Sequence, residues 1–406
     1  MIGYKELNIE LSDEQNAIKE ETHRFAREVL RPASIALDKM DPEEVIKSDL
    51  FWSAMKKGYE LGYHTIFIPD TYGGLATDPL ETHIVLEELA WGSVDFAIGL
   101  GVSCFPAFFA SMVPSERLIE EIIEPFCDCK DASIIGCWGI TEPEHGTDTL
   151  CPFTPQFTDP NIFGQVTARI DGDEWIIEGQ KSAWVSNGTI ATHTLAYLTI
   201  DTSKGMSGGG ICIIPLDLPG VRKGKPLDKM GQRALNQGEI YFDNVRVPRE
   251  YMLVDEESYD AMLDITLSTA NAGMGAMFVG VARAAYEEAL AYSKQRIQGG
   301  KPLFEHQMIK HKLFNMFMKI EAARALSRAA MIYNYNNTPP MLEYSIASKV
   351  YCTNVSLEVT SEAIQIFGGN GLSREYPIEK YFRDARAGLI EDGANDSLMI
   401  TGAHHL

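Results

Sequence analysis

The middle of the chain is set apart by the stretch "THTLAYLTIDTSKGMSGGGICIIPL" (192–216). Its two apolar runs, "THTLAYLTI" and "GGGICIIPL", have the length and the content of Thr, Tyr, Ile and Leu that favour β-strands. The segment between them, "SKGMSGGG", has the residues typical of turns. This stretch therefore predicts two neighbouring strands of a sheet.

Similar short runs continue on both sides of this stretch. They are "SIIGCWGI", "GQVTARI", "EWIIEGQKSAWV" and "GEIYFDNVRVP", and they are separated by the turn sequences "DGDE", "SNGT" and "LDLPG". Regular alternation of strand-length runs and turns predicts a small β domain over residues 130–250.

Both flanking regions have helical patterns. In residues 1–129, Ser12 and Gln15 form a capping-box pattern, after which Ile18, Phe25 and Val29 recur at helical spacing. In residues 251–406, the run "NAGMGAMFVGVARAAYEEALAYSKQR" is dense in Gly and Ala, which lets helices approach closely. The order α, β, α predicts a multi-domain α+β protein.

Composition narrows the class of protein. The formal net charge of -22, from 57 acidic and 35 basic side chains, repels phosphate backbones and argues against a nucleic-acid partner. The seven cysteines lack CxxC spacing, so the sequence predicts reduced thiols and no metal site. No apolar run approaches the length of a membrane span, and the start "MIGYKELNIELSDEQ" lacks the pattern of a secretory signal. We therefore expect a cytoplasmic protein.

The usual phosphate-binding loops are absent from the sequence: there is no GxGxxG opening a helix and no GxxxxGK[ST]. The glycine cluster "GGNG" (368–371) has bare backbone amides that suit an anion. A helix C-cap followed by a turn explains the same letters. Taken alone, the cluster favours the cap.

Two segments near the predicted sheet carry polar and aromatic side chains. The loop "GITEPEHGTD" (139–148) offers hydroxyl groups and backbone amides after an apolar strand. In "KSAWVSNG" (181–188), a strand would place Trp184 and Ser186 on one face. The tryptophan either stacks on a ring system or belongs to the core.

Near the C-terminus, "RDARAGLIEDGANDSL" (383–398) places Glu391 and Asp392 side by side before a glycine. Adjacent carboxylates repel and are usually left in solvent. The segment is therefore either a charged loop or the position of a general base.

Taken together, these segments resemble the acyl-CoA dehydrogenase family along nearly the whole chain. The resemblance rests on "GITEPEHGTD", "KSAWVSNG", "YFDNVRVP", "YSKQRIQGGKPLFEHQ", "EAIQIFGGNG" and "YFRDARAGLIEDG", in this order. It implies an N-terminal helical domain, a middle β-barrel-like domain and a C-terminal four-helix bundle.

The resemblance implies FAD as cofactor, in a cleft between the β domain and the bundle. The residues that match the family's flavin contacts are Ile140, Thr141, Trp184 and Ser186, and Thr147 stands near the pantetheine arm of the thioester. The matching pyrophosphate and ADP contacts, which the family makes in the neighbouring subunit, are Arg296, Gln307, Gln365, Gly368 and Gly369. Sharing FAD in this way implies a dimer or tetramer.

By the same resemblance, Asp392 is the base that removes the α-proton of an acyl-CoA, and Glu391 is the alternative base. The products would be a 2,3-enoyl-CoA and a reduced flavin, with an electron-transfer flavoprotein as acceptor. The expected acyl group includes branched, aromatic and alicyclic chains. The alternatives are a monooxygenase or desulfinase on the same fold, and a non-catalytic flavin- or CoA-binding protein.

The sequence departs from the family pattern at several positions. Leu267 stands where the family often has an arginine, and Thr266 where some branches have a glutamate base. Gly299 replaces a phenylalanine, Ala394 replaces a threonine, and the segment 150–164 has no counterpart.

Asp95 is a further acid of interest, in the expected acyl-pocket helix. It is either a second proton acceptor, as in branches that oxidise alicyclic thioesters, or a hydrogen-bonded helix residue.

Overall fold

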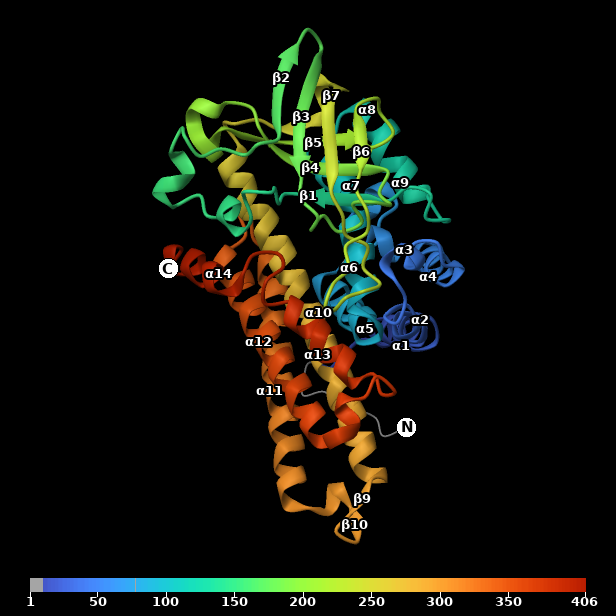
Figure 1. The fold of residues 1–406 in the computed structure, drawn as a ribbon. Coiled ribbons are helices and arrows are strands. Elements are labelled where there is room, and N and C mark those ends of the chain that lie inside the picture. The colour runs from blue at the N-terminus through green and yellow to red at the C-terminus, as the bar shows by residue number, and fades with distance from the viewer. Residues whose placement is uncertain (1–9, 77) are drawn as a thin grey trace.

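The computed structural model describes residues 10–76 and 78–406, and these form three parts in the order α, β, α (Figure 1). The predicted multi-domain α+β fold is confirmed. Most of the residues used to judge a secretory signal, 1–9, lie outside the described residues.

The N-terminal part is helical and lies beside the upper half of the C-terminal bundle in Figure 1. The predicted capping box is confirmed, because Ser12 Oγ accepts from Gln15 N–H and Gln15 Oε1 accepts from Ser12 N–H, each at 3.1 Å. The helices are α1 (Asp13–Phe25), α2 (Arg31–Leu37), α3 (Pro42–Val45), α4 (Asp49–Glu60), α5 (Pro79–Gly92), α6 (Val94–Ser103), α7 (Phe105–Met112), α8 (Glu116–Leu118) and α9 (Glu124–Asp128).

The middle part is an eight-stranded sheet with the order β6-β7-β3-β2-β4-β5-β8, in which β1 also pairs with β4. The two strands predicted from 192–216 are β4 and β5, which pair antiparallel with Leu195 opposite Ile213. They are buried over nearly their whole length, which explains their continuous apolar sequence. The strands are β1 (Gly136–Gly139), β2 (Thr167–Asp171), β3 (Glu174–Lys181), β4 (His193–Thr199), β5 (Gly209–Pro215), β6 (Val221–Lys223), β7 (Ile240–Pro248) and β8 (Met252–Val254).

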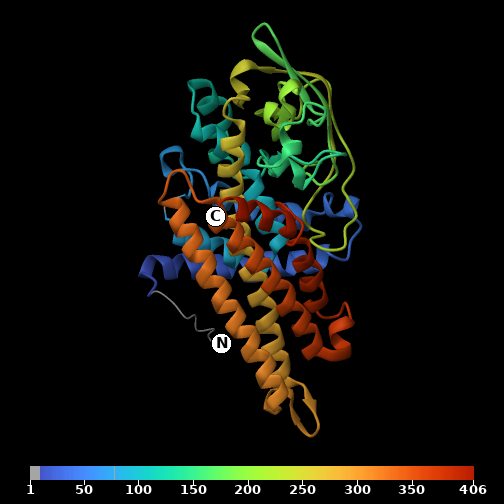
Figure 2. The same cartoon turned by 90° about the vertical axis from the view of Figure 1, so that its left-hand side faces the viewer.

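The C-terminal part is a helical bundle in which α10 runs from the middle domain to the far end (Figure 2). Its small residues permit close packing: a Cβ at Gly280 would lie 2.2 Å from the carbonyl oxygen of Glu87 on α5. The elements are α10 (Tyr259–Gln295), the hairpin β9 (Ile297–Gln298) and β10 (Lys301–Pro302), α11 (Gln307–Tyr335), α12 (Leu342–Phe367), α13 (Ile378–Ala387) and α14 (Asn395–His404).

Two helical segments are long and apolar enough to cross a membrane by length and composition, contrary to the expectation from the apolar runs. They are Val94–Met112 and Tyr259–Gln295, and 89% of the relevant window of each is buried inside the fold. Core helices of this kind pass the same test, so these segments are weak evidence of a span. All seven cysteines are buried and none forms a disulfide.

Candidate active site

The two adjacent acids lie on a tight loop between α13 and α14. Asp392 has a φ of 53° and Gly393 a φ of 98°, so both residues are in the left-handed region. For a residue other than glycine this conformation is uncommon and is concentrated at functional sites. Glycine suits this region at position 393, so the less usual conformation in the loop is that of Asp392.

Side chains from the long helices hold this loop. Lys349 on α12 donates to the carbonyl oxygen of Gly393 at 2.7 Å and to Asn395 Oδ1 at 2.8 Å. Asn271 on α10 donates to the carbonyl oxygen of Asp392 at 3.2 Å. Both side chains are fully buried, so the backbone around Asp392 is fixed from within the bundle.

The first predicted cofactor loop, 139–148, lies against the acid-bearing loop. Thr147 Oγ1 accepts a hydrogen bond from Ala394 N–H at 3.2 Å. The start of the same loop is tied to the sheet, because Lys181 donates to the carbonyl oxygen of Ile140 at 3.0 Å and to Glu142 Oε1 at 2.6 Å. This buried ion pair links Ile140 and Thr141 to the end of β3.

The second predicted cofactor segment, 181–188, is not a strand beyond its first residue. β3 ends at Lys181, and a turn follows because Asn187, with a φ of 63°, donates its side-chain amide to the carbonyl oxygens of Gly99 and Gly136. The prediction that Trp184 and Ser186 share a strand face is therefore wrong. Trp184 is not a core residue either, since 57% of it is exposed.

These two segments nevertheless meet, because Ser182 N–H donates to the carbonyl oxygen of Thr141 at 2.9 Å. Ser186 Oγ accepts from Gln237 Nε2 at 3.1 Å. Hydrogen bonds thus link the segment 181–188 to the loop 139–148, and the loop 139–148 to the loop that carries the acids.

The environment of the two acids raises the pKa of both toward neutral pH. Burial of the carboxyl group, aided by the charge of Asp392, raises the pKa of Glu391 to about 7. Burial also raises the pKa of Asp392 to about 6, although the charge of Lys349 opposes the shift. Burial lowers the pKa of Lys349 to about 8. A carboxylate with a pKa near 6 is suited to accept a proton at neutral pH.

Glu391 has a partner that the sequence did not reveal. Gln232, on the segment between β6 and β7, donates from Nε2 to Glu391 Oε1 at 2.7 Å. Lys349 and Asn271 were missed as well, because polar residues stand near both in the sequence and neither is set apart. The sequence "MGQRALNQ" around Gln232 does not set that residue apart either.

Asp95 on α6 is fully buried and engaged by three groups. Its Oδ2 accepts from Ser34 Oγ at 3.2 Å and from Ala234 N–H at 3.1 Å, and Lys380 on α13 lies 3.3 Å from Oδ1. Of the two readings of Asp95 from the sequence, this geometry favours the hydrogen-bonded helix residue.

The remaining predicted cofactor residues lie at the opposite end of the bundle. Arg296 caps the end of α10, Gln307 begins α11, and Gln365, Gly368 and Gly369 end α12, close to the β9–β10 hairpin in Figure 1. All five are exposed. Arg296 follows Asn271 by 25 positions, which corresponds to about 37 Å along the helix axis. One chain therefore presents two separate groups of candidate cofactor contacts.

The residues that depart from the family pattern have local explanations. Gly299 and Gly300, with φ of 59° and 79°, form the two-residue turn of the β9–β10 hairpin, where two consecutive positive φ values disfavour a phenylalanine. Thr266 hydrogen-bonds Tyr197 at 2.7 Å, and Leu267 is buried in the core. Asn271, also on α10, hydrogen-bonds the acid loop at the carbonyl oxygen of Asp392.

The segment 150–164 packs against the end of the chain. Phe157 is buried, and the ring of Phe153 stacks on His404 of α14 with 4.6 Å between centroids. The segment therefore adds a contact between the middle domain and α14.

Comparisons with known proteins agree with this architecture. Models described as the N-terminal, middle and C-terminal domains of acyl-CoA dehydrogenase match residues 12–121, 137–245 and 263–406. The short-chain specific acyl-CoA dehydrogenase of Megasphaera elsdenii is 31% identical over 405 residues, covering 98% of this chain and 99% of the relative.

Solved structures give the same result. Butyryl-CoA dehydrogenase from Megasphaera elsdenii superposes with a TM-score of 0.87 at 30% identity, covering 98% of this chain and 99% of that chain. A chain of a structure solved for the electron-transferring flavoprotein of Acidaminococcus fermentans gives a TM-score of 0.86 at 30% identity, with the same coverage.

The chain belongs to the acyl-CoA dehydrogenase family, whose cofactor is FAD. The residues present fit this cofactor. An exposed indole ring at Trp184 offers a stacking surface, and a Cβ at Gly368 or Gly369 would meet nothing within 4 Å, so the backbone there is open to an anionic group.

Proposed function

We propose that the protein oxidises an acyl-CoA thioester to the 2,3-enoyl-CoA, with Asp392 as the base that removes the α-proton. The observation that carries this proposal is the Asp392 loop, in a strained conformation held by Lys349, Asn271 and Thr147. A carboxylate fixed in this way loses little freedom when it meets the substrate.

FAD, when bound, accepts a hydride from the β-carbon of the acyl group. The chain supplies the other half of the reaction. Asp392 takes the α-proton. Its pKa of about 6 lies below 7, so the carboxylate is ionised at pH 7, and it lies above the ordinary value, so the carboxylate is a stronger base than an exposed aspartate. By the resemblance, the backbone N–H of Asp392 donates to the thioester carbonyl and stabilises the developing negative charge.

The flavin ring is assigned to Ile140, Thr141, Trp184 and Ser186, beside the acid loop, with Thr147 near the thioester. This assignment is supported by the hydrogen bonds that join the loops 139–148, 181–188 and 388–394.

The pyrophosphate and ADP portion is assigned to a neighbouring subunit. The distance of 25 positions from Asn271 to Arg296 favours this arrangement, because the resulting separation of about 37 Å exceeds the reach of one dinucleotide. We therefore propose that Arg296, Gln307, Gln365, Gly368 and Gly369 of one subunit bind the FAD of another, in a homodimer or homotetramer.

Exposed apolar side chains on α11 and α12 support this oligomer. Phe314 is 66% exposed and Met318 54% exposed on α11, while Tyr344 and Tyr351 lie one heptad apart on α12. α11 and α12 pair through Lys319 and Glu358 at 2.5 Å, so the two rows belong to one side-by-side pair of helices. Exposed large apolar side chains on two neighbouring helices are typical of a subunit interface.

We further propose an electron-transfer flavoprotein as the acceptor and the cytoplasm as the compartment. For the acyl group, the short-chain relative favours a short chain, and the branched, aromatic and alicyclic chains expected from the resemblance are the alternatives.

The proposal is tested by anaerobic bleaching of the bound flavin with a panel of straight, branched, aromatic and alicyclic acyl-CoA thioesters. A dehydrogenase is bleached by at least one of them, and the fastest identifies the acyl class. Flavin that needs an external reductant and oxygen would indicate a monooxygenase or desulfinase. Flavin that no thioester reduces would indicate a non-catalytic protein.

A further inference from the structure

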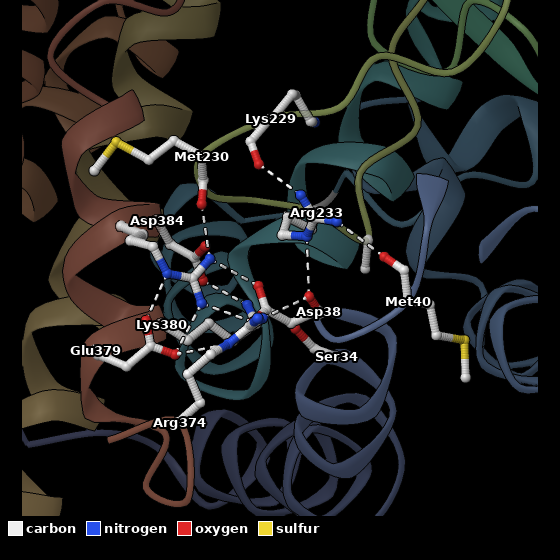
Figure 3. Close-up of polar contacts among 12 residues, drawn as sticks. Ser34, Asp38, Met40, Lys229, Met230, Arg233, Arg374, Glu379, Lys380 and Asp384 are labelled. Carbon is white, nitrogen blue, oxygen red and sulfur yellow. Dashed lines mark hydrogen bonds and ion pairs between the residues drawn. The ribbon is translucent and has the colours of Figure 1, made fainter. Parts of the chain in front are cut away.

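The segment between β6 and β7 (224–239), here called the connecting segment, lies between the N-terminal helices and α13 (Figure 3). Arg233 donates to the carbonyl oxygens of Asp38 and Met40, both at 2.9 Å. The carbonyl oxygen of Met230 accepts from Arg383 at 2.7 Å. The connecting segment thus joins all three parts of the chain next to the acid loop.

Gln232, on the same segment, is held through its backbone. It is 2% exposed, its φ is 49°, and its backbone N–H donates to Asp384 Oδ1 at 2.5 Å. Two residues further on, Ala234 N–H donates to Asp95 Oδ2. Lys380 bridges these two carboxylates, at 2.5 Å from Asp384 and 3.3 Å from Asp95.

With its backbone held in this way, Gln232 directs its side-chain amide to Glu391 Oε1. Its Nε2 lies 2.7 Å from Glu391 Oε1, and the amide does not titrate in the working pH range. The donor therefore stays in place whether or not Glu391 is protonated. A hydrogen bond from an amide N–H to an ionised carboxylate is one of the stronger hydrogen bonds in proteins.

Glu391 needs such a restraint because of its neighbours. The charged groups that face it are Asp392, which repels it, Lys349 from α12 and Lys229 from the connecting segment. A free Glu391 carboxylate would be drawn toward Lys349, which holds the carbonyl oxygen of Gly393 and so shapes the loop of the base.

We propose that Gln232 is a positioning residue that fixes Glu391 and leaves Asp392 as the acid that meets the thioester. This inference rests on the proposed function, since it assigns a base for that reaction. Asp95, Lys380 and Asp384 act through Gln232 by fixing its backbone.

A double-mutant cycle tests the inference with Gln232→Met, Glu391→Gln and the double variant. Methionine is close to glutamine in volume but cannot donate a hydrogen bond. Met230→Gln, an exposed neighbour on the same segment, is the control for substitutions there. The first readout is the Tm of the FAD-loaded protein between pH 5 and pH 8, without any thioester.

We expect Gln232→Met to lower the Tm more at pH 8 than at pH 5, because ionised Glu391 loses its donor. The same substitution should have no pH-dependent effect when residue 391 is glutamine. In flavin reduction by an active thioester, Gln232→Met should lower the rate constant about tenfold in the parent protein, from loss of one charge-assisted hydrogen bond. In the Glu391→Gln background, Gln232→Met should change this rate constant little.

Equal effects in both backgrounds would show a purely structural role and overturn the inference. If Gln232→Met does not fold, the exchanged pair replaces it: Gln232→Glu alone should lower the Tm at pH 8, and adding Glu391→Gln should restore it. Failure of that rescue would also overturn the inference. The Tm readout needs no substrate, so it separates this result from a failure of the proposed reaction.

Discussion

Thr147 Oγ1 accepts a hydrogen bond from Ala394 N–H at 3.2 Å, so a loop of the sheet domain is fastened to the residue two places after Asp392. This bond joins the expected flavin side of the active site to its acid side. The chemistry of the protein therefore depends on how the middle domain and the C-terminal bundle are held together.

The first prediction separates the two adjacent acids. Asp392→Asn should retain FAD but lower the rate of flavin reduction by about a thousandfold or more, as expected when a general base is removed. Glu391→Gln should lower it by no more than about tenfold, because glutamine has nearly the same shape and Glu391 is not the residue that takes the proton. Stopped-flow reduction by an active thioester measures both. The opposite ranking would make Glu391 the base.

The second prediction concerns stability and pH. The pKa of Glu391 is about 7 in the folded protein against an ordinary value of 4.5, so the folded protein keeps a proton that the unfolded chain has lost. The stability should therefore fall as the pH rises through this window and stay lower above pH 7. Glu391→Gln should gain Tm over the parent protein at pH 8 and gain little at pH 4.5. The exposed Glu14, changed to Gln, is the control; a parallel gain there would refute the assignment.

The third prediction concerns Lys349. Lys349→Met leaves Gly393 and Asn395 without their donor and removes the charge that keeps the pKa of Asp392 from rising further. The acidic limb of the pH profile for flavin reduction should move to higher pH, and the free energy of unfolding should fall by about 2–4 kcal/mol for two buried groups left unpaired. Lys349→Arg, which keeps the charge, should leave the position of the limb in place. A limb that stays fixed in the Met variant would exclude this electrostatic role.

The fourth prediction concerns Asp95. Asp95→Asn breaks a buried pair with Lys380 and should destabilise the protein by about 3 kcal/mol, measured by urea unfolding. Ser34→Ala removes one neutral donor from the same carboxylate and should cost about 1 kcal/mol. Flavin reduction by straight-chain thioesters should persist in folded Asp95→Asn. Loss of activity confined to cyclic thioesters would instead support a second proton acceptor.

The fifth prediction concerns the apolar face of α11. The pair Phe314→Glu and Met318→Glu should shift the protein to monomers in sedimentation and release FAD, because the proposed site takes contacts from two subunits. Ile170→Glu, at an equally apolar exposed position on β2, should change neither. Monomers that keep FAD at full occupancy would contradict the shared site.

Much of the fold follows from the sequence because its patterns are local. The capping box at Ser12 and Gln15, and the continuous apolar runs of β4 and β5, each depend on residues close together in the chain. The turn letters "SNGT" were read correctly, but the end of β3 at Lys181 was missed, because Asn187 is held by carbonyl oxygens of Gly99 and Gly136, which are distant in sequence.

The candidate site divides in the same way. The pair Glu391 and Asp392 was visible as adjacent letters, and the structure adds a strained loop and raised pKa values to it. Gln232 lies 159 positions before Glu391, and only tertiary packing brings the two together. Asp95 was visible as an acid in an apolar helix, whereas its partner Lys380 was not.

Because α10 is one uninterrupted helix, it restricts where the sequence can gain or lose residues. Deleting one residue between Asn271 and Arg296 would turn Arg296 by about 100° around the helix axis and draw it about 1.5 Å closer. Such a deletion would misalign the proposed nucleotide-binding end with the proposed partner subunit while leaving each local contact of Asp392 unchanged. Insertions should be tolerated in surface segments such as 336–341 and selected against throughout this helix.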